Sequence, residues 1–347
     1  MKTRLDLLFL LGRPLGPVYG MVMNIRALFY RHGIFTVHHM GAPVISVGNL
    51  VLGGTGKSPM VRHLARLLQS SGFQPAVISR GYGGTASEAV NIVSDGGKLL
   101  LNAAQAGDEP FMLAKSLPGV SIVTGSKRRF PAAWAEKEQG ADCLVLDDAF
   151  QHMAVARDIN IVLFDSTALT GNGRIFPAGP LREPSSALRR ANCFVLTGTT
   201  DANAEQAAKF AARLRERFPE KQVFLARRKQ YRLYSETGEV VSCDGLPAAS
   251  AFCGIAHPER FEQSLKELGI SLKMFTALPD HFTYTQNSLQ KFCKEAGEAG
   301  AEVLITTEKD IVKAGELESS LPILTARFEV ALPKEFDRYI LERLQKK

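Results

Sequence analysis

The chain has 347 residues, 45% apolar and 22% charged, proportions that exclude a disordered or fibrous protein and predict about two domains with buried cores. Its five cysteines are scattered without CxxC or zinc spacing, which favours reduced thiols in a cytosolic compartment. The net charge of +7 favours acidic partners, such as phosphorylated ligands or an anionic membrane surface. We expect no nucleic-acid partner, because no nucleic-acid-binding motif accompanies the charge.

Residues 1–34 form a basic, apolar segment that differs from the rest of the chain. Two apolar runs, 7–11 and 16–25, are accompanied by five basic residues and one acid. A membrane-spanning helix needs about 20 apolar residues, and Arg13 with two prolines interrupts this stretch too early. The segment also lacks the small-residue cleavage site that a secretory signal peptide needs. Two interpretations remain: a helix packed on the protein's own core, or an interfacial segment lying on anionic lipid. We favour the second.

The stretch 44–69 carries the strongest motif of the sequence. Val44, Ile45 and Val47 are typical of a buried parallel strand, and apolar residues at helical spacing follow from Met60. Between them lies a glycine-rich turn: Gly53, Gly54, Thr55, Gly56, Lys57 and Ser58. A strand, such a turn and a helix start form the phosphate-binding P-loop, whose backbone N–H groups converge on a polyphosphate. Lys57 would reach the outer phosphates, and the Ser58 hydroxyl would bind Mg²⁺.

One position departs from the usual P-loop pattern. Val51 stands where the pattern G-x-x-x-x-G-K-[ST] has its first glycine. A chance GTGKS in an ordinary loop is the alternative interpretation. The flanking strand and helix make nucleotide binding the better hypothesis.

Strand and helix patterns alternate after the P-loop. Further strands are predicted at 76–80, 120–124, 143–146, 159–164 and 193–197. This alternation predicts an α/β fold: a P-loop NTPase-like, doubly wound, mostly parallel sheet whose ligands bind at the carboxyl ends of the strands. The pattern changes near residue 200. We therefore expect an N-terminal segment 1–34, a P-loop domain 35–200 and a smaller α/β domain 201–347, and we leave open whether its C-terminal tail returns to the P-loop domain.

Several polar residues lie at predicted strand ends or in turns. Asp147 and Asp148 follow an apolar strand, as Walker B acids that hold Mg²⁺ do, although a helix cap also uses such acids. Gln151 and His152 lie close enough to reach the phosphates or to form core hydrogen bonds. The sequence gives weaker evidence of function at two other positions. Asp108 begins a predicted helix and can be a simple cap, and an isolated histidine such as His281 is usually structural.

Taken together, the motifs resemble the tetraacyldisaccharide 4'-kinase family, the lipid A 4'-kinases of Gram-negative bacteria. The matching runs extend in order from residue 47 to residue 310: VGNLVLGGTGKSP (47–59), SRGYGG (79–84), GDEP (107–110), LDDAFQH (146–152), PAGPLREP (177–184), PDHF (279–282) and ITTEKD (305–310). Val51 resembles the family's own variation. Ala149 replaces an expected glycine at a place that should not affect the chemistry.

The resemblance implies a peripheral or monotopic kinase on the cytoplasmic face of the bacterial inner membrane. It would transfer the γ-phosphate of ATP, with Mg²⁺, to the 4'-hydroxyl of tetraacyldisaccharide 1-phosphate and give lipid IVA. By the same resemblance, Asp108 is the catalytic base with His281 as its partner, and Lys57, Arg128 and Arg182 stabilise the transferred phosphate. The remaining matches are Gln151 and His152 at the nucleotide, and Ser58, Asp147, Asp148 and Glu183 at the metal.

A second class of function stays open at this stage. A membrane-docked P-loop ATPase that switches partners would share the P-loop and the basic N-terminus, and it would need no small-molecule acceptor. The two classes differ in the fate of the γ-phosphate. A kinase leaves it on the lipid, whereas a switch releases it to water.

Overall fold

The computed structural model describes residues 4–228, 231–255, 258–279, 282–314 and 317–345, and these divide into two compact units. The first unit contains Met1–Ala106, Leu113–Arg228 and Val330–Lys347, and the second contains Gly107–Met112 and Lys229–Glu329. The P-loop unit therefore continues past residue 200, where the sequence suggested a boundary, and ends at Arg228. The C-terminal tail belongs to the first unit.

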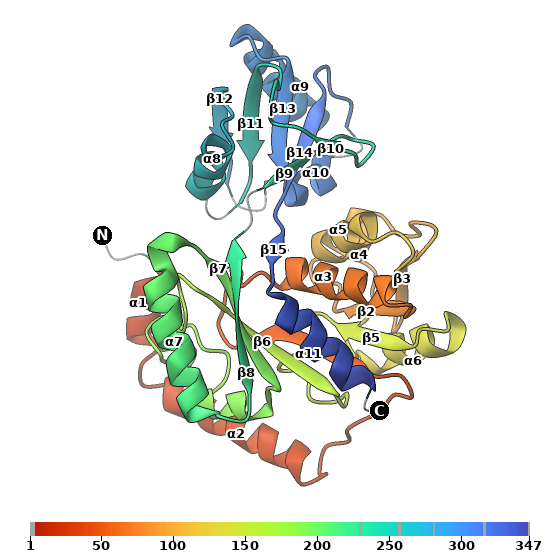
Figure 1. Cartoon of the computed structure of the whole chain (residues 1–347), viewed down its shortest axis with the longest axis vertical. Helices are drawn as coiled ribbons and strands as arrows, with labels where there is room; N and C mark the ends of the chain where they lie inside the picture. The colour runs from red at the N-terminus through yellow and green to blue at the C-terminus, as the bar shows by residue number, and fades with distance from the viewer. Residues whose placement is uncertain (1–3, 229–230, 256–257, 280–281, 315–316, 346–347) are drawn as a thin grey trace. The chain divides into compact units, whose positions relative to one another are not determined.

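The first unit is built on the sheet that contains the strands labelled β2, β5, β6, β7 and β8 in Figure 1. Among the described residues this sheet has nine strands, in the order β15-β8-β7-β6-β1-β5-β2-β4-β3. Its strands are β1 (Val44–Asn49), β2 (Pro75–Ser79), β3 (Asn91–Asp95), β4 (Ser121–Thr124), β5 (Cys143–Leu146), β6 (Ile159–Asp165), β7 (Cys193–Thr199), β8 (Gln222–Arg228) and β15 (Val330–Ala331). Only the two edge pairs, β3 with β4 and β15 with β8, are antiparallel. The predicted doubly wound, mostly parallel sheet is confirmed.

The connections place the P-loop at the switch point of this sheet. β1 lies between β5 and β6, with Ile45 opposite both Val145 and Ile159. The chain builds one half of the sheet from β2 to β5 and then crosses to β6 on the other side of β1. Ligands of such sheets bind at the carboxyl ends of the strands, where the order reverses. The turn after β1 occupies that place.

Helices cover both faces of this sheet because the strands are buried on both faces. The helices of the first unit are α1 (Arg4–Leu11), α2 (Gly16–Arg31), α3 (Lys57–Ser70), α4 (Ala103–Ala106), α6 (Arg129–Glu138), α7 (Ala204–Arg217) and α11 (Lys334–Gln345), with 3₁₀ helices at Ser185–Arg190 and Asp201–Asn203. Small residues let helices lie close to the sheet: Ala207 and Ala211 of α7 pack on the β6–β8 half. The helix α5 (Asp108–Ser116) begins in the second unit and ends in the first.

The second unit has its own sheet, in the order β10-β9-β14-β13-β11-β12. Its elements are β9 (Arg232–Tyr234), β10 (Val240–Val241), β11 (Ala249–Cys253), α8 (Pro258–Glu267), β12 (Leu272–Ala277), α9 (Gln286–Glu298), β13 (Val303–Thr307), α10 (Glu308–Ala314) and β14 (Ile323–Arg327). β11 to β14 are parallel, and β9 and β10 are antiparallel. These strands and helices form a smaller α/β unit.

The N-terminal helix α2 has one packed face and one exposed apolar face. Gly16 and Gly20 are buried against the loop 175–178, and a Cβ on Gly16 would lie 3.1 Å from Ala178. The opposite face exposes Leu15, Val18 and Met21, each more than half accessible. The packed-helix interpretation therefore describes one face of this helix, and contact of the other face with lipid stays a prediction. Among the described residues, no helix has the length and apolarity to cross a membrane.

Candidate functional site

The P-loop lies between β1 and α3, and its backbone takes the shape that the glycines permit. Gly53 has a φ of +113° and Gly56 a φ of +76°, values that side-chain-bearing residues rarely adopt. Gly56 directly precedes Lys57, the first residue of α3. The N-terminus of α3 therefore points its free N–H groups and the positive end of its dipole at the turn, which suits a bound phosphate.

Three polar side chains hold this turn. The Asn49 side chain is fully buried, and its amide donates to Thr55 Oγ1 at 2.9 Å and to the Gly53 carbonyl at 3.4 Å. The Thr197 hydroxyl, at the end of β7, donates to the Thr55 carbonyl at 2.9 Å. The Gln151 amide donates to the Asn49 carbonyl at 2.9 Å. Gln151 thus supports the P-loop from behind, and its contact with a phosphate stays a prediction.

Val51 departs from the P-loop pattern for a structural reason. It is buried and forms an antiparallel bridge with Leu181, flanked by hydrogen bonds from Leu52 to Pro180 and from Arg182 to Leu50. Residue 51 is thus in an extended pairing and not in the phosphate-binding turn, so it needs no glycine. The same pairing fixes the loop before Arg182 alongside the P-loop.

Lys57, Asp148 and Arg182 meet at the carboxyl ends of β1 and β5. One guanidinium nitrogen of Arg182 donates to both Asp148 carboxylate oxygens, at 3.0 and 3.1 Å. The Lys57 ammonium lies 3.8 Å from the same carboxylate. Asp148 also has a φ of +43°, a strained value for a residue with a side chain, and such strain concentrates at functional sites. Two cations therefore share one carboxylate beside the P-loop.

The preceding acid has a different environment. Asp147 is 2% exposed, and the Ser79 hydroxyl donates to its Oδ2 at 3.3 Å. Asp147 and Asp148 therefore differ in burial and in partners, a division that the sequence does not reveal. Arg128 is buried nearby; its desolvation and then the charge of Arg80 lower the pKa of its guanidinium, which Asp147 and Asp148 oppose.

His152 lies among arginines. Burial, followed by the charges of Arg128, Arg157 and Arg26, lowers the pKa of its imidazole to about 4, so the ring is neutral at pH 7. Its Nε2 is buried and finds no hydrogen-bond partner among the described residues. A neutral imidazole with a free nitrogen can bind a hydroxyl or phosphate oxygen, and this role in nucleotide binding stays a prediction.

The donors available for a metal are oxygens, as Mg²⁺ prefers. Ser58 and the two Walker B acids follow β1 and β5. Glu183 is 1% exposed, and its Oε2 accepts a 2.6 Å bond from Arg190 while Oε1 has no partner in the described part of the chain. No three His, Cys, Asp or Glu side chains of the described residues gather to hold a metal by themselves. Hydroxyl and carboxylate oxygens fit a magnesium ion that arrives with phosphate and water ligands. All four metal assignments stay predictions.

Asp108 is the first residue of α5 and belongs to the second unit. The Lys313 ammonium of α10 lies 3.4 Å from its Oδ2. His281, the expected partner of Asp108, lies outside the described residues. Lys313, Asn49 and Thr197 were not identified as site residues from the sequence.

Comparisons with known proteins agree along nearly the whole chain. Residues 8–345 match the family described as tetraacyldisaccharide-1-P 4'-kinase. A tetraacyldisaccharide 4'-kinase of Desulfotalea psychrophila is 44% identical, covering 97% of each chain, and one of Geobacter metallireducens is 42% identical, covering 89% of each. The crystal structure of LpxK from Aquifex aeolicus in complex with ATP has 31% identity and a TM-score of 0.77, covering 97% of this chain and 99% of that one.

Proposed function

The chain belongs to the tetraacyldisaccharide-1-P 4'-kinase family, and from that premise we propose that it phosphorylates the 4'-hydroxyl of tetraacyldisaccharide 1-phosphate with ATP. The products are lipid IVA and ADP. This places the protein in lipid A biosynthesis as a phosphotransferase with an alcohol acceptor. The observation that carries the proposal is the meeting of Lys57 and Arg182 on Asp148, beside a P-loop at the switch point of the sheet.

Phosphoryl transfer depends on cations around the transferred group more than on covalent help from the protein. Lys57 and Arg182 both contact Asp148, so the outer oxygens of an entering triphosphate compete for them with one carboxylate. Arg128 adds a third, buried cation. A magnesium ion held by Ser58 and the Walker B acids would neutralise the phosphate oxygens. The P-loop N–H groups and these side chains bind and orient the triphosphate.

The acceptor hydroxyl is a poor nucleophile until it loses its proton. As its oxygen bonds to the γ-phosphorus and the bond to ADP breaks, we propose that the Asp108 carboxylate accepts the proton, with His281 as its partner. Asp108 is about one-third exposed, so its carboxylate is accessible to solvent. One of its oxygens faces Lys313, and the other remains for the hydroxyl.

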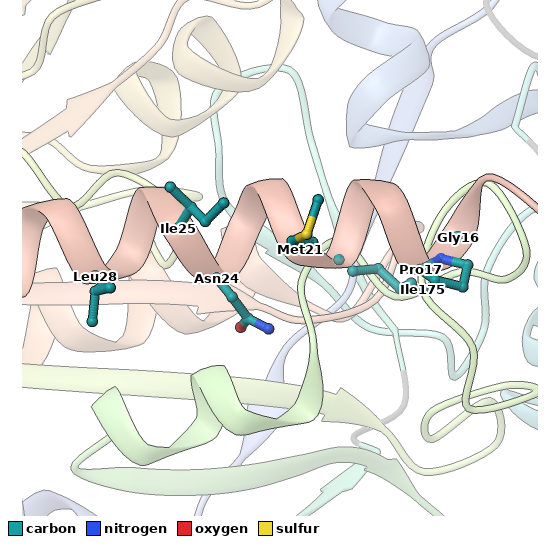
Figure 2. Close-up of a pocket in the computed structure, with 8 residues that line it drawn as sticks. Gly16, Pro17, Met21, Asn24, Ile25, Leu28 and Ile175 are labelled. Carbon is teal, nitrogen blue, oxygen red and sulfur yellow. The ribbon is translucent and has the colours of Figure 1, made fainter.

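We propose that α1 and α2 lie on the cytoplasmic face of the bacterial inner membrane. The apolar side chains Leu15, Val18, Met21, Val22, Ile25 and Leu28 are exposed along one helix. A groove of about 490 Å³ follows the same helix, lined by Gly16, Pro17, Gly20, Met21, Asn24, Ile25, Leu28 and Ile175 (Figure 2). Arg13 and Arg31 are exposed at the two ends of α2 and can meet anionic head groups. An enzyme that acts on acylated sugars gains from lying where those sugars are held.

Two contacts join this helix to the nucleotide site. Tyr19 donates to the Arg182 carbonyl at 3.3 Å, and Arg26 donates to the Gln151 carbonyl at 3.1 Å. Because Gln151 in turn supports Asn49 behind the P-loop, the proposed lipid-facing helix and the phosphate-binding turn belong to one hydrogen-bonded structure.

Mass spectrometry of the acceptor tests the proposal. Purified protein is incubated with ATP, Mg²⁺ and detergent-solubilised tetraacyldisaccharide 1-phosphate. We expect a product that is heavier by one phosphate, with fragments that locate the phosphate on the distal glucosamine. An acceptor recovered without added mass, together with free phosphate released from ATP, would instead identify an ATPase switch.

A further inference from the structure

Lys313 is a largely buried lysine with a single polar contact. Its side chain is 14% exposed, and the Asp108 carboxylate at 3.4 Å is the only hydrogen-bond or ion-pair partner that we find for it among the described residues. A lysine normally keeps its ammonium in water, because burial of an uncompensated charge is costly. The position of this lysine is therefore explained by the carboxylate that it faces.

The helix that carries Lys313 is firmly anchored. Asp310, fully buried in the first turn of α10, accepts hydrogen bonds from the Gly254 N–H at 3.1 Å, the Tyr284 hydroxyl at 2.9 Å and the Thr307 hydroxyl at 2.6 Å. Glu308, at the start of α10, pairs with Arg327 of β14 at 3.3 Å. A side chain one turn after Asp310 thus starts from a fixed backbone.

The hydrogen bonds of Asp310 also involve a residue close to the PDHF run (279–282). The Tyr284 hydroxyl, which Asp310 binds, belongs to a residue two positions after Phe282, the last residue of the PDHF run. A Cβ added at Gly254 would lie 3.2 Å from both Phe282 and the Pro279 carbonyl. Asp310 therefore fixes both α10 and the described flanks of the PDHF turn within the second unit.

We propose that Lys313 is a positioning residue for phosphoryl transfer. Its ammonium holds Oδ2 of Asp108, so that the carboxylate directs Oδ1 toward the acceptor hydroxyl. Lys313 contacts neither ATP nor the acceptor in this role, and it acts through Asp108 alone. The inference rests on the proposed function, because it assigns Lys313 to the base of that reaction.

The test compares kcat and KM for transfer to the glycolipid among five full-length variants and the wild-type protein. Lys313→Met should lower kcat by about 10- to 100-fold, the usual effect of a misplaced reacting group, and leave the KM for ATP within about twofold. Lys313→Arg, which keeps the charge, should recover most of the rate. Lys291→Met is the matched control: Lys291 forms an ion pair with Glu295 at 3.7 Å on the solvent-exposed face of α9, in the same unit, and should behave as wild type.

A double mutant separates positioning from a general structural role. In an Asp108→Asn background, Lys313→Met should cost no further activity, because the carboxylate through which Lys313 acts is already absent. A wild-type kcat for Lys313→Met, or an equal loss of rate in the Asp108→Asn background, would overturn the inference. If the unmodified protein transferred no phosphate to the glycolipid, the proposed function would fail first, and the role of Lys313 with it.

Discussion

The hydroxyl of Thr197 offers a specific test of how the P-loop is held. Thr197 is 4% exposed, and its Oγ1 donates to the Thr55 carbonyl at 2.9 Å and lies 3.2 Å from the Phe164 carbonyl. Gly56 follows Thr55 with a φ of +76°. The hydroxyl therefore fixes the turn just before the N–H groups of α3. Thr197→Val keeps the shape of the side chain and removes only the donor.

The size of the effect follows from the unpaired carbonyl. A buried acceptor left without its partner costs about 1 to 3 kcal/mol of folding free energy. If about 1 to 2 kcal/mol of this reflects disorder that ATP must reverse, the Kd for Mg–ATP rises about 5- to 30-fold, since 1.4 kcal/mol corresponds to tenfold. The loss of binding free energy for Mg–ATP cannot exceed the free energy that is needed to reorder the P-loop.

A matched control lies in the second unit. Thr306 is fully buried on β13 and donates to the Phe252 carbonyl at 2.9 Å, without any part in the P-loop. Thr306→Val should lower the free energy of unfolding by a similar amount and leave the Kd for ATP unchanged. Calorimetric titration with Mg–ATP and urea unfolding measure the two quantities. Equal ATP affinity in both variants and wild type would refute the role of Thr197 in ordering the P-loop.

Three further predictions follow from the site and the N-terminal helix. Lys57→Ala should abolish transfer and leave the melting temperature nearly unchanged; near-normal turnover would remove the P-loop from the mechanism. Burial lowers the pKa of His152 to about 4, so the unfolded chain binds a proton between about pH 4 and 6.5 that the folded chain does not, and stability falls as the pH drops through this window. Urea titrations at pH 7 and pH 4.5 measure how much unfolding free energy each protein loses on acidification. This loss should be about 1 to 2 kcal/mol smaller in His152→Gln than in wild type, after allowance for solvent screening. Identical losses in the two proteins would contradict the burial of the ring. Leu15→Glu with Met21→Glu changes only exposed positions, so it should lower binding to anionic vesicles at least tenfold with the fold intact, and unchanged sedimentation would show that α2 does not bind lipid.

The centre of the fold was predictable because its sequence signals are strong and local. β1, β5 and β6 are apolar runs buried on both faces, and glycines mark the turn after β1. The edge strands β3 and β12 were not predicted, because the burial of their side chains follows no clear period. β14 is buried, but it has only two large apolar residues, too few to identify a strand.

The site was predictable in its parts and less so in its contacts. Strand ends placed Lys57 and Asp148 at one edge of the sheet, but the pairing of residues 50–52 with 180–182, which sets Arg182 beside them, depends on segments far apart in sequence. Lys313 could not be identified for the same reason, because only its ion pair with Asp108, a residue far away in sequence, distinguishes it from other lysines. Residues 107–112 belong to the second unit through contacts that no local pattern records.

The most direct test follows the γ-phosphate of ATP. The protein is supplied with γ-labelled ATP, Mg²⁺ and tetraacyldisaccharide 1-phosphate, and ADP, free phosphate and labelled lipid are counted over time. Our account predicts one ADP for each labelled lipid, with little free phosphate and little ADP when the acceptor is omitted. Label released as free phosphate at a rate that the acceptor does not change would contradict it.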